Sequence, residues 1–250
     1  NQRMDNIFLN RLLDLSKKAD ATCRYTFTYF LGLDELSVLN QNKRALGCYT
    51  LFGGAKNCER VIARFGDEQE FGYIQDFPIT IIKAEPVLKK FADTLTHRDF
   101  LGAIMNLGIE RKNIGDIIVK DNVAYIFVID KMAEYILKNL SKVKHTVIKL
   151  GITYDFPEGE LYKTERSSFA VSSLRLDAVI AAVYNLSRSQ ANELFGLKKV
   201  FVNGKLTENT SHLIKENDVV SLRGFGRFIF VSKGGTTKKG KTYISIDMFV

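Results

Sequence analysis

The first part of the chain shows both helical and extended hydrophobic patterns. Apolar residues recur at nearly helical spacing over 7–15, which predicts an amphipathic helix. We expect a second helix over 34–45 and a strand over 48–52, which ends in two glycines. A helix that contains Glu59, Arg60 and Ile62 is expected next. These elements predict a small α/β domain over residues 1–76.

The middle of the chain alternates strands and helices. Strands are expected at 79–82, 116–119, 123–128 and 145–150, and helices at 96–107 and 131–140. Their order, βαββαβ, is the ferredoxin-like plan, which we assign to residues 77–152. The commonest RNA-binding sheet domain shares this plan. The strand over 123–128 lacks the aromatic signature of that domain, so the topology supports RNA binding only by analogy of fold.

The last third predicts a third domain. Residues 153–168 are rich in charge and lack periodicity, so we expect a linker there and a domain over 169–250. One amphipathic helix is expected to open at Ser172 or Ser173, and a second at Ser187, where Gln190 completes a capping box. A small, mostly antiparallel sheet should follow, with a hairpin at Asn203-Gly204 and strands near 200–202, 219–222, 227–231 and 243–246. The whole chain is therefore an α+β multidomain protein.

Composition narrows the class of protein. The 250 residues are 46% hydrophobic and 26% charged, which is typical of a globular chain. The chain has no apolar run of about 18 residues and no signal-peptide pattern at the start, so we expect a cytoplasmic protein without membrane insertion. Cys23, Cys48 and Cys58 lack CxxC spacing, and we expect buried free thiols. The three histidines have no metal-ligand spacing, so neither a metal nor another cofactor is expected.

The positive charge is concentrated at one end of the chain. The net charge is zero over residues 1–85, +1 over 86–165 and +7 over 166–250, within a total of +8. A compact domain with that excess favours a polyanionic partner, nucleic acid above all, although a merely solvated basic face would give the same count.

The candidate RNA-binding residues lie at helix starts, turns and loops, from which several side chains can reach one phosphate backbone. Arg188 is expected at the first helical position, where an anion would meet free backbone N–H groups and a guanidinium. The loop over 233–241 adds a cationic finger, and Arg98, at a helix start in the central domain, is a possible secondary contact. The candidates in the last domain are Arg175, Ser187, Arg188, Gln190, Lys198, Lys199, Asn203, Lys205, Arg223, Arg227 and Lys233.

Several ordered motifs resemble a known RNA-binding domain. Leu174-Arg-Leu-Asp177, Ser187-Arg188 with Ala191, Val200-Phe-Val-Asn-Gly204 and Asn217-Asp-Val-Val220 resemble the domain first seen in small-subunit ribosomal protein four, the S-four domain. This resemblance implies an S-four-type αL RNA-binding domain at the C-terminus. It also marks one departure, because Lys198 stands where such domains often place glycine. A lysine in a left-handed turn would be strained, so we expect a differently shaped helix end, with Gly196 as its stop.

Upstream motifs resemble the bacterial YlmH proteins. They are Phe52-Gly-Gly54 with Glu59-Arg60, Thr96-His-Arg-Asp-Phe-Leu-Gly102, Asn106-Leu-Gly-Ile109, Ile114-Gly-Asp-Ile-Ile-Val119 and Ser173-Leu-Arg-Leu-Asp-Ala-Val-Ile180. With the terminal domain, the likeness spans nearly the whole chain. It implies three domains, a link to ribosomes and to the rescue of stalled large subunits, and a cell-division label drawn from gene neighbourhood.

Three motifs suggest chemistry that their context does not support. Residues 235–242 fit the phosphate-binding pattern GxxxxGK[ST], but a strand and not a helix follows them, so we expect a hairpin loop and no nucleotide cofactor. Arg175-Leu-Asp177 echoes a pseudouridine synthase motif, but we expect Asp177 in the first turn of a helix. Gly53-Gly54 could cradle a phosphate, but two glycines more often form only a turn.

We therefore predict a non-enzymatic protein that binds structured RNA, with no catalytic residues. The resemblance suggests ribosomal RNA or tRNA on the large subunit, in quality control of stalled translation. A protein-interaction factor in cell division, with incidental RNA binding, is the alternative, and an RNA-modifying enzyme is a lesser one.

Overall fold

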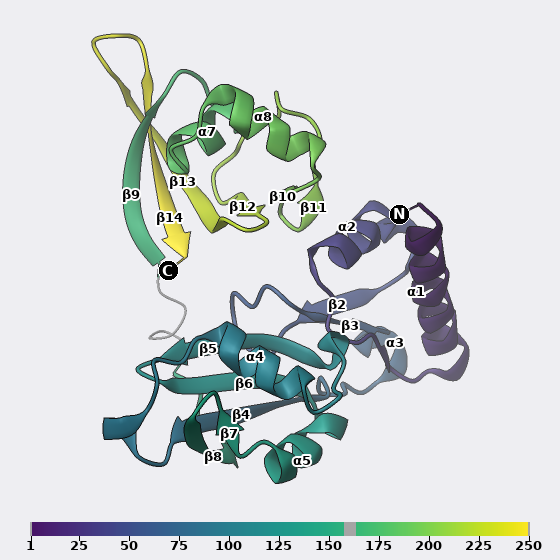
Figure 1. Ribbon diagram of the computed structural model, residues 1–250. Coiled ribbons are helices and arrows are strands. Elements are labelled where there is room, and N and C mark those ends of the chain that lie inside the picture. Colours follow the sequence, from purple (N-terminus) through teal and green to yellow (C-terminus); the bar gives the residue numbers. More distant parts are fainter. Residues whose placement is uncertain (1, 158–163, 250) are drawn as a thin grey trace. The chain divides into compact units, whose positions relative to one another are not determined.

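The structure is a computed structural model that describes residues 2–157 and 164–249 (Figure 1). These residues form two compact units. The first holds Asn1–Glu35 and Asn42–Leu161, and the second holds Leu36–Gln41 and Tyr162–Val250. None of the described helices combines the length and the apolarity that a membrane span requires.

The first unit begins with a helix and a small sheet. The predicted N-terminal helix is confirmed as α1 (Gln2–Thr22), and its inner face buries Leu12 and Ala19. The other elements are β1 (Thr26–Phe27), β2 (Tyr49–Phe52), β3 (Ile62–Phe65) and α3 (Glu68–Phe71). Helix α2 (Leu33–Gln41) begins in the first unit, but its residues Leu36–Gln41 belong to the second. The three strands form an antiparallel sheet in the order β1-β3-β2.

The predicted helix containing Glu59, Arg60 and Ile62 is wrong. Ile62 begins the central strand β3, whose four residues Ile62–Phe65 are all buried. A short segment that is buried on both faces has no alternation of apolar and polar positions, so its periodicity cannot distinguish a strand from a helix. Glu59 and Arg60 lie in the preceding loop.

The central part of the first unit has the predicted ferredoxin-like order. Its sheet is antiparallel throughout, in the order β5-β6-β4-β8-β7. Helices α4 and α5 cover one face, where Ile82, Ile126 and Ile136 join one hydrophobic core. The elements are β4 (Ile79–Pro86), α4 (His97–Met105), β5 (Ile114–Lys120), β6 (Val123–Ile129), α5 (Asp130–Asn139), β7 (Lys142–Val143) and β8 (Thr146–Ile152).

A half-buried arginine links the loop between β2 and β3 to strand β5. Arg60 donates from Nε to the carbonyl of Ile114 at 3.0 Å and from Nη2 to the carbonyl of Phe30 at 2.9 Å. The Asp116 carboxylate accepts the backbone N–H groups of Glu59 and Arg60 at 2.8 and 2.9 Å. These bonds fix the loop between β2 and β3 against strand β5.

The second unit contains a six-stranded antiparallel sheet in the order β11-β10-β12-β13-β14-β9. Helices α7 and α8 lie together on one face of this sheet, and the β13–β14 hairpin extends beyond them (Figure 1). The elements are β9 (Thr164–Val171), α7 (Leu176–Val183), α8 (Arg188–Gly196), β10 (Val200–Val202), β11 (Lys205–Leu206), β12 (Val219–Leu222), β13 (Gly226–Thr236) and β14 (Thr242–Phe249).

The predicted linker overlaps a strand. Residues 164–168 form the start of β9, which pairs with β14 along its whole length. These residues are polar and largely exposed because β9 is an edge strand, held by its backbone, so they lack the apolar alternation of a strand. Residues 158–163 of the predicted linker lie outside the described residues.

Two further predictions concern loops and thiols. Residues 235–242 form the predicted hairpin: Thr236 of β13 pairs with Thr242 of β14, and in the loop between them the Thr237 N–H donates to the Lys241 carbonyl at 2.7 Å. The cysteines are free, as expected, but they are not buried: Cys23 and Cys48 are exposed and Cys58 is half-buried.

Candidate RNA-binding surface

A buried carboxylate lies at the start of helix α7. Asp177 is 1% exposed, and it accepts hydrogen bonds from two arginines. Arg175 donates from Nε to Oδ1 and from Nη2 to Oδ2, both at 3.2 Å. Arg188 donates from Nη2 to Oδ2 at 2.6 Å. Asp177 Oδ1 also accepts the N–H of Ala178 at 2.8 Å. The carboxylate therefore holds two guanidinium groups side by side, and we call this group the Asp177 clamp (Asp177, Arg175, Arg188).

The clamp keeps its carboxylate ionised and its arginines accessible. Burial by itself would raise the pKa of Asp177, but the hydrogen bonds from Arg175 and Arg188 outweigh it, so the pKa lies below its ordinary value. The two arginine side chains remain 41% and 48% exposed. Guanidinium groups held in one geometry lose little side-chain entropy when they bind phosphate.

The helix starts differ from the prediction in detail. The N-cap of α7 is Arg175, not Ser172 or Ser173, and the Ser172 hydroxyl accepts from Arg188 Nη1 at 3.4 Å instead. The predicted capping box of α8 is confirmed: Ser187 Oγ accepts the Gln190 N–H, and Gln190 Oε1 accepts the Ser187 N–H. The polar groups of Ser187 and Gln190 are therefore used within the helix cap.

The end of helix α8 is built around Lys198. The helix includes Gly196, and Lys198 adopts the left-handed conformation, with φ of 55°, that we expected a lysine to avoid. Lys198 N–H donates to Phe195 O and Lys199 N–H to Leu194 O, both at 3.0 Å, which is the pattern of a Schellman motif. These two bonds compensate for the unfavourable φ and bring two consecutive lysines to the surface.

Two candidate arginines lie on the sheet face that is opposite the helices. Residues that alternate with the core positions of β10 and β13 point to this face. Arg223 stacks over the ring of Phe201, with 5.4 Å between guanidinium carbon and ring centroid, and Arg227 stacks over Phe249 at 4.0 Å. Each ring supports a guanidinium group by cation–π attraction.

The remaining candidates lie at the two hairpins. Asn203, with φ of 50°, forms the predicted turn with Gly204, but its side-chain amide is already bonded to Asp218 and to the Val219 N–H. Lys205 follows on the edge strand β11, and Lys233 lies on β13 near the other hairpin. Both lysines are exposed.

The eleven candidates do not meet at one point. The Asp177 clamp unites Arg175 and Arg188 on the helix side, and a backbone bond of 2.9 Å from Arg223 N–H to Lys199 O brings a second group together beyond the end of α8. Arg227 projects from the opposite sheet face, and Lys205 and Lys233 belong to different hairpins. Arg98, in the first unit, is exposed in the first turn of α4, whose N-cap is Thr96.

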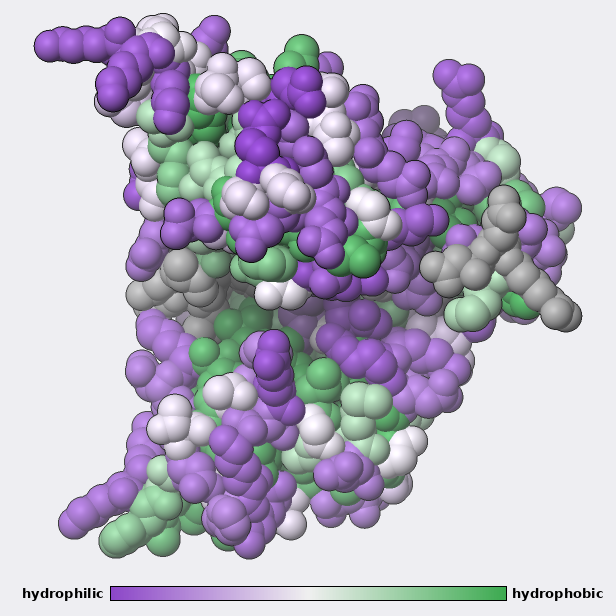
Figure 2. Space-filling model, turned by 45° about the horizontal axis from the view of Figure 1, so that its top comes forward, coloured by the Kyte–Doolittle hydropathy of each residue, from purple (hydrophilic) through white to green (hydrophobic). Residues whose placement is uncertain are grey.

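Hydropathy does not single out a binding surface. Hydrophilic residues cover most of the face drawn in Figure 2, in both units. The second unit is distinguished by the buried Asp177 carboxylate, which holds two exposed arginines in place. The sequence analysis did not predict this role of Asp177. A buried Asp177 between two arginines had one available signal, the aspartate inside an otherwise apolar helical run at 176–183.

Two family models match the chain. The model described as "Putative RNA-binding domain in YlmH" matches residues 73–154, and the S4 domain model, which describes the S-four domain, matches residues 174–220. Both families are families of RNA-binding domains. The second match contains the Asp177 clamp and the Lys198 turn.

One curated relative aligns with nearly the whole chain. It is the Ribosome-associated protein quality control protein P2 of Bacillus subtilis, 27% identical over 249 residues, with 97% of this chain and 95% of the relative covered. A solved structure, the cell division protein ylmH from Streptococcus pneumoniae, is 23% identical with a TM-score of 0.48, and covers 60% of this chain and 91% of its own. The chain is thus similar to YlmH proteins over nearly its whole length, and its two family matches are to the putative RNA-binding domain in YlmH and to the S4 domain.

Proposed function

We propose that this protein binds structured RNA of the large ribosomal subunit, ribosomal RNA or tRNA, and acts without catalysis in the quality control of stalled translation. The observation that carries the proposal is the Asp177 clamp, because it presents two accessible guanidinium groups in a fixed geometry within the S4 domain. The name of the Bacillus subtilis relative supports the ribosomal setting. Cytoplasmic location follows from that setting.

The clamp would bind phosphate and position the RNA. Arginine forms bidentate, charge-assisted hydrogen bonds with phosphate oxygens, and such contacts fix orientation without reading sequence. Lys198 and Lys199 would contact the backbone further along, since the nine residues of α8 span about 13 Å. Arg223, Arg227, Lys205 and Lys233 would extend the footprint over other parts of the unit.

Charge reversal in the clamp tests the proposal. The full-length protein is titrated with tRNA and with a large-subunit RNA hairpin over a range of salt concentrations. We expect Arg188→Glu to weaken binding more than tenfold. Asp177→Asn should weaken it severalfold, because both arginines lose their anchor while the positive charge increases. If about five to eight phosphates are neutralised, log affinity should fall with log salt by about 0.7 to 0.9 per contact.

A matched charge reversal provides the control. Arg24 is exposed after α1 in the first unit, so Arg24→Glu changes net charge equally but leaves the clamp intact. Equal losses for Arg188→Glu and Arg24→Glu would show that only total charge matters and would contradict the proposal, as would tighter binding by Asp177→Asn.

A protein-interaction role in cell division is the second candidate. The near-neutral charge of residues 1–165 favours it, because that part lacks the general attraction to polyanions. Nuclease treatment of a pull-down separates the two functions: partners that persist after RNA removal support the interaction role, and partners that disappear support RNA binding.

A further inference from the structure

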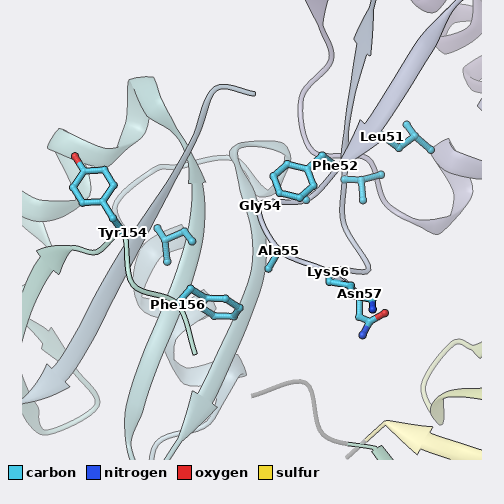
Figure 3. A pocket seen from close by; sticks show the side chains of 11 residues that line it. Leu51, Phe52, Gly54, Ala55, Lys56, Asn57, Tyr154 and Phe156 are labelled. Atoms are coloured by element: carbon cyan, nitrogen blue, oxygen red, sulfur yellow. The ribbon is translucent and has the colours of Figure 1, made fainter. Parts of the chain in front are cut away.

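The first unit contains a pocket that the S4 domain does not explain. It has a volume of about 640 Å³ and lies between the loop after β2 and the segment that follows β8 (Figure 3). Its lining combines aromatic rings, aliphatic side chains and the backbone of a glycine loop. The lining residues most relevant to a ligand are Phe52, Gly53, Gly54, Lys56, Tyr154 and Phe156.

Glycine is required on the loop side of the pocket. A Cβ on Gly53 would lie 2.5 Å from the carbonyl oxygen of Arg60, and a Cβ on Gly54 would lie 2.5 Å from the ring of Phe127. Gly54 also has φ of 102°, which favours glycine. The loop can therefore lie close to the central sheet and still leave space beside it. No helix follows these glycines, so they form a turn and not the phosphate cradle at a helix N-terminus.

Aromatic rings border the pocket from two sides. Phe52, at the end of β2, is 40% exposed, and Tyr154, beyond β8, is 96% exposed. Figure 3 shows Phe52 on one side of the pocket and Phe156 and the backbone of Tyr154 on the other, with the Tyr154 ring pointing outward from the pocket rim. A tyrosine exposed to this extent gains almost nothing from burial, whereas exposed rings beside a cavity are platforms for stacking.

The sheet itself does not offer such rings. Tyr125 and Phe127 of β6 point to the face that is opposite α4 and α5, where an RNA-binding sheet would stack its bases. Phe156 packs edge-on against both, at centroid distances of 5.4 and 5.1 Å, and Gly54 lies against Phe127. The open face is thus covered in part, and the accessible rings lie at the pocket instead.

We propose that this pocket binds one unpaired nucleotide of the RNA. The proposal rests on the proposed function, that the protein binds RNA. The volume lies in the range of small-ligand sites and exceeds what one side chain fills. Every base has a π-face that can stack on Phe52 or Tyr154, and the exposed Lys56 supplies a positive charge for the adjacent phosphate. Two lining residues, Ile81 and Tyr154, fall within the RNA-binding domain match over 73–154.

The test uses the full-length chain with two RNA probes. The first is an unstructured seven-nucleotide RNA with one 2-aminopurine, whose emission is quenched when it stacks on an aromatic ring. The second is the large-subunit hairpin. The first titration is made in the Arg188→Glu background at raised salt, so that the S4 domain contributes little. Stacking on one ring changes affinity by about 5- to 150-fold.

We expect Tyr154→Ala and Phe52→Ala to abolish the quenching and to weaken the heptamer about tenfold, with hairpin binding unchanged. Phe91→Ala is the matched control, since Phe91 is 78% exposed in the same unit but does not line the pocket. Unchanged quenching and affinity in both pocket variants would overturn the proposal. Adenosine monophosphate that binds while the heptamer does not would also overturn it. Failure of the proposed function would appear in a separate measurement: Arg188→Glu would leave the affinity for the hairpin unchanged.

Discussion

Each unit contains a group of arginines that contact other parts of the protein, and the two groups are used in opposite ways. In the first unit, Arg60, Arg64 and Arg111 turn inward, and their guanidinium groups donate to backbone carbonyls. In the second unit, Arg175 and Arg188 keep nearly half of each side chain at the surface, and a buried carboxylate supports them from behind. Net charge alone cannot distinguish these uses. It locates a ligand surface only where the guanidinium groups remain accessible.

The cost of the inward arrangement appears in the pKa values of the first unit. Burial, and then the neighbouring Arg60, lower the pKa of Arg111 to about 10, and burial lowers the pKa of Arg60 as well. The positive charges of Arg60 and Arg111 stay close together because both side chains donate hydrogen bonds to backbone carbonyls. Arg60 donates to Phe30 and Ile114, and Arg111 donates to Ile114 and Gly115. These arginines are therefore expected to determine stability, and the clamp arginines to determine binding.

The largest effect that separates the two roles is expected from Arg60→Ala. The variant removes the Arg60 donor from the Phe30 carbonyl, whereas the Ile114 carbonyl loses Arg60 but keeps the bond from Arg111 Nη1. We expect a loss of about 2 kcal/mol in the free energy of unfolding of the first unit, since an acceptor left unpaired inside a protein costs about 1 to 3 kcal/mol. Denaturant unfolding followed by the fluorescence of a reporter placed in the first unit measures it.

The same Arg60→Ala protein should bind the RNA hairpin with unchanged affinity below its unfolding transition. Arg188→Glu should show the reverse pattern, with a stability close to that of the parent protein and weak binding. A single variant that lost both properties in proportion would break the distinction between the two uses of arginine.

Local sequence signals predicted much of this arrangement. The Thr96–Asp99 and Ser187–Gln190 capping boxes, the Asn203-Gly204 turn and the βαββαβ order each depend on residues close in sequence. Such signals specify the local backbone conformation directly, because a helix cap or a type I′ turn needs particular residues at fixed spacing. The helix ends and hairpins that present the candidate residues could be located for that reason.

The failures share a different cause, which is tertiary contact. Strand β3 has no alternation because both of its faces are buried, and the first half of strand β9, residues 164–168, has no apolar pattern because its side chains are largely exposed and only Phe169 and Val171 reach the core. The role of Asp177 depends on Arg188, eleven residues away on another helix. The pocket combines residues near 52 with residues near 154. No local pattern contains these partners, so the sequence could not indicate them.

A smaller effect is expected at Lys198, where binding and stability are opposed. Lys198→Gly removes the strain of a left-handed lysine, so we expect the free energy of unfolding to rise by about 0.5 to 1 kcal/mol, after the greater freedom of glycine in the unfolded chain is counted. The loss of one positive charge should weaken RNA binding about two- to threefold. Thermal unfolding and hairpin titration measure the two changes.

Lys198→Ala is the matched control for that substitution. It removes the same charge but keeps a Cβ in the left-handed turn, so it should weaken RNA binding equally without the gain in stability. If the alanine and glycine variants were equally stable, the conformation of Lys198 would not be strained, and the trade-off would have no basis.

The smallest effect concerns the two capping boxes, one acidic and one neutral. Asp99 in α4 accepts hydrogen bonds from the hydroxyl and the N–H of Thr96, both at 2.8 Å, and its carboxylate lies 3.0 Å from Lys144 Nζ. The Thr96 bonds, and then Lys144, lower the pKa of Asp99 to about 2. A pKa below the ordinary value stabilises the fold above about pH 4, and this contribution is lost as pH falls toward 2. Gln190 occupies the same place in α8 and does not titrate.

Amide hydrogen exchange on the full chain should therefore separate the two helix starts in acid. We expect protection of the Thr96 amide to fall between about pH 4 and 2, while protection of the Ser187 amide, corrected for intrinsic exchange, stays level until global unfolding. Asp99→Asn should remove the pH dependence at Thr96 and leave Ser187 as it was. Parallel loss at both amides would mean that the acid response is global, and the difference between the two caps would carry no consequence.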